Sequence, residues 1–247
     1  EPQPIDEAAW QALQRFGGFP EPYLRADGRF HNRWRRLRTE QLFRDDIRDL
    51  TRIQELDQLE LLARLLATNV GQLTNQSWLS RQTRVAVDTV RRWLATLEAF
   101  YFCFPVRPWH RNVARALRKE PKYYLWDWTQ ATAEGARAEN LVASALLKSV
   151  HGWTEAGLGD FGLYFVRDKE GHEVDFLVTR DGAPSFLVEV KRSEREALSP
   201  ALDRFQRQTG AAHAFQVALD AEFVAADCFA RKTPVIVPAR TLLAQIW

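Results

Sequence analysis

Two short apolar stretches joined by a turn sequence constrain the fold of this chain more than any other feature. Residues 173–178 read Glu-Val-Asp-Phe-Leu-Val, residues 186–191 read Phe-Leu-Val-Glu-Val-Lys, and Gly182 and Pro184 lie between them. Apolar and polar residues alternate in both stretches, which predicts strands with one buried face each. We expect a hairpin that buries Val174, Phe176 and Val178 from the first strand and Phe186, Val188 and Val190 from the second.

The charged residues of this hairpin are predicted to meet on its other face. In an antiparallel hairpin the residue numbers of paired residues add up to a constant value. A five-residue loop at residues 180–184 fixes that value and therefore the pairs. A slip by one residue would turn every side chain to the opposite face, so the prediction depends on this register. The predicted pairs are Thr179 with Ser185, Asp175 with Glu189, and Glu173 with Lys191.

Two carboxylates directly opposite each other repel, so Asp175 and Glu189 need a compensating positive charge. Mg²⁺ or Mn²⁺ would supply it, because these ions prefer carboxylate, carbonyl and water oxygens and can activate water toward a phosphate ester. Lys191 would hold that water or neutralise the phosphate. The alternative is an ordinary exposed hairpin, in which a Glu173–Lys191 ion pair contributes little to stability.

The spacing of these residues resembles the signature of the PD-(D/E)xK nuclease superfamily. Asp175 is followed after thirteen residues by Glu189, and Lys191 follows after one more, although Val174 stands where the superfamily has proline. The resemblance implies a restriction-endonuclease-like α-β-β-β-α-β domain with Asp175, Glu189 and Lys191 as catalytic residues. Periodicity predicts the same order of elements: a helix at 136–150, strands at 161–167, 172–179 and 185–191, a helix at 198–209 and a strand at 212–218.

Glu139 is a further candidate for this site. It shares one predicted helical face with Val142 and Leu146, where a carboxylate is costly unless it is paired or bound to a metal. Glu139 also matches the helix acid of the superfamily, which implies an assisting catalytic role. The alternative is that Glu139 lies in the first turn and complements the helix dipole.

The length and charge distribution indicate several small modules rather than one domain. The chain has 247 residues and 46% hydrophobic content, enough for one or two cores. We expect a mixed α/β protein with a helical segment over residues 1–58, a winged helix over 59–130 and the nuclease-like domain over 131–247. The overall charge is only +2, but residues 59–130 carry 11 basic and 5 acidic side chains, a pattern compatible with nucleic-acid binding or with a solvated surface.

Residues 77–98 are typical of a helix-turn-helix. A short helix from Ser77, a turn at residues 84–86 and a helix from Val87 are expected, with Val85, Val90, Trp93, Leu94 and Leu97 facing inward. Apolar stretches at 101–104 and 122–126 predict two strands and hence a winged helix, which serves either nucleic-acid binding, DNA in particular, or protein packing. The predicted phosphate contacts are Arg91, Arg92, Arg111, Arg115 and Arg118.

A second resemblance extends over nearly the whole chain. The chain resembles the C-terminal region of a group of bacterial and archaeal AAA-type ATPases, in which a P-loop domain precedes a winged helix and a PD-(D/E)xK-like domain of unknown function. The matching segments are Gly-Gly-Phe-Pro-Glu at 17–21, Arg-Asp-Asp-Ile-Arg-Asp-Leu at 44–50, Pro-Lys-Tyr-Tyr-Leu-Trp-Asp at 121–127, residues 135–142, and the blocks around Glu173 and Lys191.

This resemblance implies that ATP binding and self-association belong to the P-loop domain. The sequence contains no Gly-x-x-x-x-Gly-Lys-Ser/Thr motif, so we expect no ATPase activity from it. A basic group in the first 58 residues would face that ATPase domain or form surface ion pairs with neighbouring acids, and we favour the ion pairs. This group consists of Arg35, Arg36, Arg38, Arg44 and Arg48, next to Trp34.

The remaining composition restricts the cellular setting. Cys103 and Cys228 show no spacing typical of disulfide frameworks or zinc sites, which fits a reducing cytoplasm. No long apolar run or signal-peptide pattern occurs, so a membrane partner is not expected. The chain begins at Glu1 and lacks methionine, and we expect it to be a fragment of a longer protein.

Two functions follow from the sequence. The first is a Mg²⁺- or Mn²⁺-dependent nuclease, in which Asp175 and Glu189 bind the metal, Lys191 positions water, Glu139 assists, and the winged helix delivers the nucleic acid. The second is a non-catalytic module that binds nucleic acid or protein and regulates an ATPase.

Overall fold

The structure, a computed structural model, describes residues 3, 5–51, 53–110 and 120–246. The chain forms two compact units. The N-terminal unit comprises Glu7–Pro105 and Lys122–Arg137, and the C-terminal unit comprises Glu1–Asp6, Val106–Pro121 and Ala138–Trp247. The protein is mixed α/β with a seven-stranded mixed sheet, which confirms the predicted fold class.

The N-terminal unit begins with short helices whose ends follow from their sequence. Gly17 has a φ of +83°, a conformation that few other residues adopt readily, and it ends the first helix. Pro20 begins the second helix, at a position where a backbone N–H would have no acceptor within the helix, so the missing N–H of proline costs nothing there. The Asp27 side chain caps the third helix by accepting from the backbone of Phe30. These elements are α1 (Glu7–Phe16), α2 (Pro20–Arg25), α3 (Gly28–Gln41), the π-helix η1 (Leu42–Ile47) and α4 (Arg48–Leu50).

Three further helices of this unit match the predicted helix-turn-helix and the helix before it. They are α5 (Leu56–Thr68), α6 (Gln76–Thr83) and α7 (Val87–Ala99). The turn after α6 requires a residue in the left-handed conformation. Arg84 adopts it, with a φ of +57°, in place of the glycine that is usual there. Four of the five side chains predicted to face inward are buried: Val90, Trp93, Leu94 and Leu97. The fifth, Val85, is half-buried.

The strands follow in the order β2-β1-β3-β4-β5-β6-β7. Strand β1 (Cys103–Pro108) belongs to both units, and β2 (Lys122–Leu125) belongs to the N-terminal unit and precedes the short helix η2 (Trp128–Gln130). In the C-terminal unit the final part of β1 pairs in parallel with β3. Strand β1 begins two residues later than predicted and extends beyond Phe104 to Pro108.

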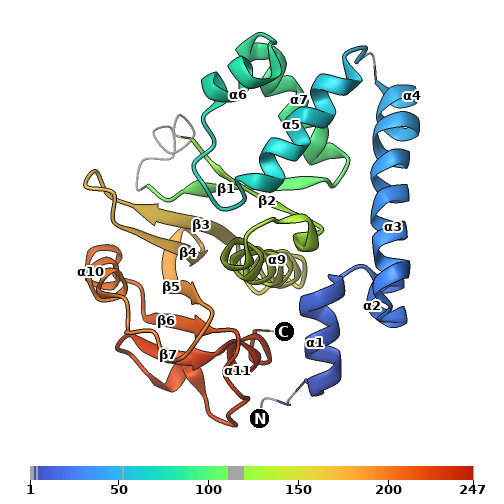
Figure 1. Ribbon diagram of the computed structural model, residues 1–247. Coiled ribbons are helices and arrows are strands. Elements are labelled where there is room, and N and C mark those ends of the chain that lie inside the picture. The colour runs from blue at the N-terminus through green and yellow to red at the C-terminus, as the bar shows by residue number, and fades with distance from the viewer. Residues whose placement is uncertain (1–2, 4, 52, 111–119, 247) are drawn as a thin grey trace. The chain divides into compact units, whose positions relative to one another are not determined.

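The C-terminal unit confirms the predicted α-β-β-β-α-β order. Figure 1 shows α10 against β4–β6 and α11 beside β7. The last strand and helix, β7 and α11, were not predicted. The elements are α9 (Glu134–Glu155), β3 (Phe161–Arg167), β4 (Glu173–Arg180), β5 (Ala183–Lys191), α10 (Pro200–Thr209), β6 (His213–Ala218), the short helix η3 (Cys228–Ala230), β7 (Val235–Pro238) and α11 (Ala239–Leu243).

The hairpin between β4 and β5 corrects the predicted loop. Arg180 pairs with Ala183 and Thr179 pairs with Pro184, so the turn is the two residues Asp181 and Gly182, both with positive φ, as two-residue hairpins prefer. The predicted Thr179–Ser185 pair is therefore wrong. An irregularity between Val178 and Thr179 shifts the register by one residue. On the side of the candidate site the pairs are the predicted ones: Val178 with Phe186, Leu177 with Leu187, and Phe176 with Val188.

A second irregularity lies in β4 at the candidate site. Tyr164 of β3 pairs with Leu177, and Val166 pairs with Val174, so two residues of β4, Asp175 and Phe176, lie opposite one residue of β3. This is a β-bulge, which interrupts alternation and redirects side chains. As a result Val174 packs with Leu177 rather than with the predicted Phe176 and Val178, in a core cluster beneath α10 that also contains Leu187, Leu202 and Phe205.

A buried polar network joins α3 to the segment after β2 in the N-terminal unit. His31 Nε2 lies 3.2 Å from Thr129 Oγ1, and that hydroxyl donates to Asp127 Oδ1 at 2.6 Å. Burial lowers the pKa of His31 below 6.5; Asp127 partly opposes this effect, and Arg35 adds to it.

This network predicts an acid-sensitive contribution to stability. Below pH 6.5 the unfolded chain binds a proton at His31 that the folded chain resists, so the free energy of unfolding falls as pH falls through that window. We expect His31→Gln to remove this part of the pH dependence, as measured by urea unfolding at several pH values between about 5 and 7.5. Equal pH dependence in parent and variant would contradict the assignment.

None of the described helices is both long enough and apolar enough to cross a membrane.

Candidate active site

The structure brings Asp175, Glu189 and Lys191 together at the end of the β4–β5 hairpin. Lys191 Nζ donates to Glu189 Oε1 at 2.9 Å, and the backbone N–H of Val190 donates to Asp175 Oδ2 at 2.8 Å. Strand pairing ends at Phe176–Val188, so the Asp175 carboxylate bonds to β5 just beyond the ladder. The bulge positions Asp175 there, next to the strand that carries the other two residues.

One oxygen of this site forms no hydrogen bond within the part of the chain that the structure describes. Glu189 is only 7% exposed, and among the described residues its Oε2 atom is buried without a hydrogen bond. A buried charged oxygen without a partner costs free energy, and such atoms are uncommon in native proteins. They are typical of sites that bind a ligand or an ion.

The electrostatics of the site favour a cation. Burial by itself would lower the pKa of the Lys191 ammonium, but the hydrogen bond to Glu189 and the charges of Glu189, Asp175 and Glu196 together raise it above 10.5. Lys191 is therefore charged at neutral pH and cannot act as a base there. Three carboxylates, those of Glu189, Asp175 and Glu196, thus act together on the Lys191 ammonium.

These residues fit a divalent cation. Hard ions such as Mg²⁺ and Mn²⁺ take carboxylate oxygens, and Glu189 Oε2 makes no hydrogen bond to any described residue that such an ion would have to replace. Asp175, half-buried on the neighbouring strand, offers a second carboxylate. The assignment of the metal to Asp175 and Glu189 stays a prediction.

The predicted surface ion pair between Glu173 and Lys191 is replaced by other pairs. Glu173 pairs with Arg167 of β3 at 2.9 Å, while Lys191 pairs with Glu189. Lys191 is 31% exposed and Glu189 only 10% by side chain, so their pair is shielded from solvent more than a surface ion pair.

Glu139 lies on α9 in the same unit, half-buried beside the fully buried Val142 and Leu146. Because α9 begins at Glu134, Glu139 lies beyond the first turn, where the helix dipole has little effect. The dipole alternative is therefore wrong. Its role as a catalytic residue stays a prediction.

The predicted phosphate contacts are described only in part. Arg91 and Arg92 lie exposed on α7, where Arg91 pairs with Asp88 at 2.7 Å and Arg92 donates to Thr89 at 3.3 Å. These contacts span a single helical turn and leave further N–H groups for a ligand. Arg111, Arg115 and Arg118 lie outside the described residues.

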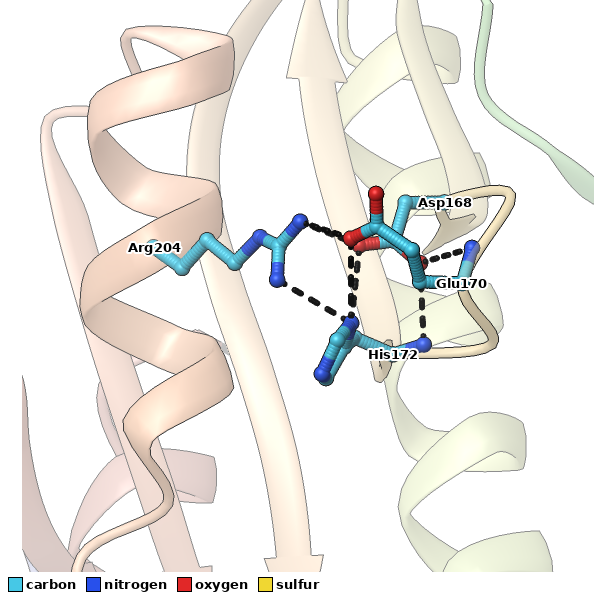
Figure 2. A network of polar contacts seen from close by, with 4 residues as sticks. All are labelled: Asp168, Glu170, His172 and Arg204. Atoms are coloured by element: carbon cyan, nitrogen blue, oxygen red, sulfur yellow. Dashed lines mark hydrogen bonds and ion pairs between the residues drawn. The ribbon is translucent and has the colours of Figure 1, made fainter.

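Sequence reasoning missed a charged cluster between β3 and β4. Figure 2 shows Asp168, Glu170 and His172 around the guanidinium of Arg204 from α10. Arg204 Nη2 lies 2.9 Å from Asp168 Oδ2 and 2.5 Å from Glu170 Oε2, and Nη1 lies 3.0 Å from His172 Nδ1. Burial would raise the pKa of Asp168, but the hydrogen bonds from His172 and the charge of Arg204 lower it below 3.8.

Asp168, Glu170 and His172 place ligand atoms within 4.8 Å of one another, as a metal site requires. The Arg204 guanidinium, however, already supplies the positive charge, so we interpret the cluster as an ion-pair clamp between the β3–β4 loop and α10. The alternating Asp-Lys-Glu-Gly-His in the loop was the only local signal. Its partner Arg204 is 32 residues from His172, beyond any local pattern.

Gln216 is a second residue that sequence reasoning missed. It is fully buried on β6, directly beside Glu189 in the parallel pairing. Its side chain donates to the carbonyls of Glu196 and Ala197 and accepts from the N–H of Ser199. Gln216 thus fixes the segment that follows Lys191 and leads into α10.

Comparison with known families places the chain among proteins of undetermined function. The chain belongs to the family described as "Domain of unknown function (DUF8612)", whose match covers residues 7–133. Residues 134–232 match a second family, "Domain of unknown function (DUF4143)". The border between the two matches falls where α9 begins.

Two curated relatives are similar to part of the chain. The uncharacterized proteins Rv2008c of Mycobacterium tuberculosis and Mb2031c of Mycobacterium bovis are each 28% identical to the chain over 142 residues. The alignment covers 55% of this chain but only 32% of each relative, so the chain matches about a third of their length. No solved structure matches the chain at a comparable level of significance.

Proposed function

We propose that the C-terminal unit is a metal-dependent nuclease module that hydrolyses phosphodiester bonds of nucleic acid, DNA in particular. The observation that carries the proposal is the buried Oε2 of Glu189, which has no hydrogen-bond partner among the described residues, next in the chain to Val190, whose backbone N–H donates to Asp175 Oδ2. A buried carboxylate oxygen without a hydrogen bond costs free energy even though the other oxygen is paired with Lys191, so this arrangement supports a role in binding rather than in stability.

Each side chain has a defined task in this proposal. Asp175 and Glu189 would hold Mg²⁺ or Mn²⁺, and when bound the ion supplies charge stabilisation at the phosphate and a more acidic water. Lys191, held by Glu189 at 2.9 Å, would donate hydrogen bonds to the attacking water or to a phosphate oxygen. Glu139 would assist from α9.

The N-terminal unit would bring the nucleic acid to this module. Its α6–α7 pair has the helix-turn-helix order, and Arg91 and Arg92 on the exposed side of α7 would contact backbone phosphates. The DUF4143 family is typically found in proteins associated with AAA-type ATPases. We infer that ATP binding and self-association belong to a P-loop domain outside this sequence, and that the protein acts in the cytoplasm.

A second function is supported by the same ion pair. Lys191 is already bonded to Glu189, as it would be in a purely structural pair, and the matched families have no assigned activity. The chain would then be a non-catalytic module that binds nucleic acid or protein and regulates an ATPase.

A divalent-ion melting experiment tests the metal site. An ion that binds only the folded state stabilises it by about 2.7 kcal/mol at 100 times its dissociation constant, a shift of several degrees for a chain of this size. We expect millimolar Mn²⁺ or Mg²⁺ to raise the melting temperature of the parent relative to EDTA, and Asp175→Asn to abolish that rise.

Glu222→Gln is the matched control, because it removes an exposed carboxylate of the same unit. It should retain the full shift. A shift that persists in Asp175→Asn would place the ion elsewhere, for example at Asp168 and Glu170, and would contradict the proposed site.

A further inference from the structure

A groove of about 640 Å³, lined mostly by polar and charged residues, opens between α3 and α5 in the N-terminal unit. Its lining includes four arginines against two glutamates, Glu40 and Glu60. We call it the arginine groove, and its arginines are Arg35, Arg36, Arg44 and Arg64.

Polar side chains of α3 and α5 line the groove. Asn32, Arg35, Arg36 and Thr39 lie on one face of α3 at helical spacing, and Arg64 and Thr68 lie on one face of α5. Neighbouring helices in a compact unit ordinarily face each other with apolar residues. Helix α3 instead contains five arginines and one acidic residue.

Most of the guanidinium donors in the groove are unused. Among the described residues, Arg36 has no carboxylate within ion-pair distance. Arg44 lies 3.8 Å from Glu40, and Arg64 lies 3.5 Å from Glu60, both longer than the 2.7–2.9 Å typical of charge-assisted hydrogen bonds. The predicted surface ion pairs of Arg44 are therefore weak. Arg35 donates one hydrogen bond to the carbonyl of Thr129 at 3.2 Å.

The dimensions and chemistry fit a phosphate chain. Arg36 and Arg44 are eight residues apart on the continuous α3–η1 rod, roughly 10 Å along its axis, which spans about two to three phosphates of a nucleic-acid strand. Guanidinium groups match phosphate oxygens in pairs of hydrogen bonds. The described lining contains no aromatic side chain for base stacking, which points to the backbone rather than the bases.

We propose that the arginine groove binds the sugar-phosphate backbone of a nucleic-acid strand, without sequence preference. The groove shares no residue with Asp175, Glu189 and Lys191 or with Arg91 and Arg92. Its binding therefore does not depend on the proposed cleavage chemistry.

The test is fluorescence anisotropy of short labelled single-stranded and duplex DNA with the full chain, in EDTA and over a range of salt concentrations. The groove variant carries Arg36→Gln, Arg44→Gln and Arg64→Gln. The control variant carries Arg29→Gln, Arg33→Gln and Arg207→Gln, which are exposed and outside the groove and change the net charge equally. Inorganic triphosphate is titrated separately, and thermal melting compares the folding of all proteins.

We expect the groove variant to bind DNA at least about 10-fold more weakly near 0.1 M salt, with the slope of log affinity against log salt reduced by about 2 to 3. The control variant should bind like the parent. Equal losses in both variants, or none in the groove variant, would overturn the proposal. If the groove variant loses binding of triphosphate but binds DNA like the parent, the groove binds a free phosphate compound, and the proposal is overturned as well.

Because EDTA prevents metal-dependent cleavage, the binding result is separate from the nuclease test. If DNA binding depends on the groove but no cleavage is found, this inference is supported and the nuclease proposal is not. If cleavage is found but DNA binding does not depend on the groove, the nuclease proposal is supported and this inference is not.

Discussion

Replacing Lys191 by alanine is expected to reduce cleavage of nucleic acid by this chain at least about 100-fold, since the loss of one donor to a developing oxyanion typically costs 10²–10³ in rate. Lys191 is charged at neutral pH and bonded to Glu189 at the proposed metal site. The measurement is gel analysis of labelled single- and double-stranded DNA and RNA incubated with Mg²⁺ or Mn²⁺, with parent and variants purified identically.

Two further variants make this test specific. Asp175→Asn should lose cleavage as well, because it removes a proposed metal ligand and weakens the acceptor for the Val190 N–H. Lys169→Ala, an exposed lysine in the β3–β4 loop, should cleave like the parent. Cleavage that survives in Lys191→Ala and Asp175→Asn would point to a contaminating nuclease. If the parent cleaves none of the substrates, the regulatory-module function becomes the better one.

Leu187→Ala is expected to lower the free energy of unfolding by about 2–5 kcal/mol, the usual cost of truncating a fully buried leucine. Leu187 is 0% exposed and packs with Leu177, Leu202 and Phe205 between β4, β5 and α10. The loss combines the transfer of apolar surface with a cavity that neighbours cannot fill completely. Urea unfolding followed by circular dichroism measures it.

Leu158→Ala is the matched control, because Leu158 is 54% exposed. Its effect should stay within about 0.5 kcal/mol, as for most surface substitutions. Similar losses for the two variants would mean that the β5–α10 packing contributes less than its burial indicates. Strand β5 carries both Glu189 and Lys191, so this packing also supports the candidate site.

The sequence was sufficient for features that local pattern determines. Alternation of apolar residues predicted β4 and β5, because a strand with one buried face must repeat every two residues. Helical spacing predicted α7 with Trp93 and Leu94 inward, and the turn before it was correctly placed even without glycine. The glycines at 17 and 18 are explained by the structure: a side chain at Gly18 would lie 2.6 Å from the ring of Trp128.

Predictions failed where a neighbouring element decides the outcome. The turn at Asp181 and Gly182 is shorter than predicted because an irregularity beyond it absorbs the extra residue. Strand β7 was missed because four residues carry too little periodicity, and its existence depends on pairing with β6. The register was nevertheless correct from Val178–Phe186 to Phe176–Val188, since both strands must keep their apolar side chains in the core, whereas the predicted Asp175–Glu189 and Glu173–Lys191 pairs lie beyond the last paired residues.

The sequence by itself determined the order of the elements and the approach of Asp175, Glu189 and Lys191, because residues on adjacent strands of one hairpin have few ways to pair. Only the tertiary structure decided which oxygen is left without a partner, where the bulge redirects Asp175, and which arginines gather in one groove. Arg204 reaches Glu170 across 34 residues of chain, and Arg36 shares a groove with Arg64 of another helix. Such contacts depend on how separate elements pack, and packing is set by the buried surfaces of the whole unit rather than by neighbours along the chain.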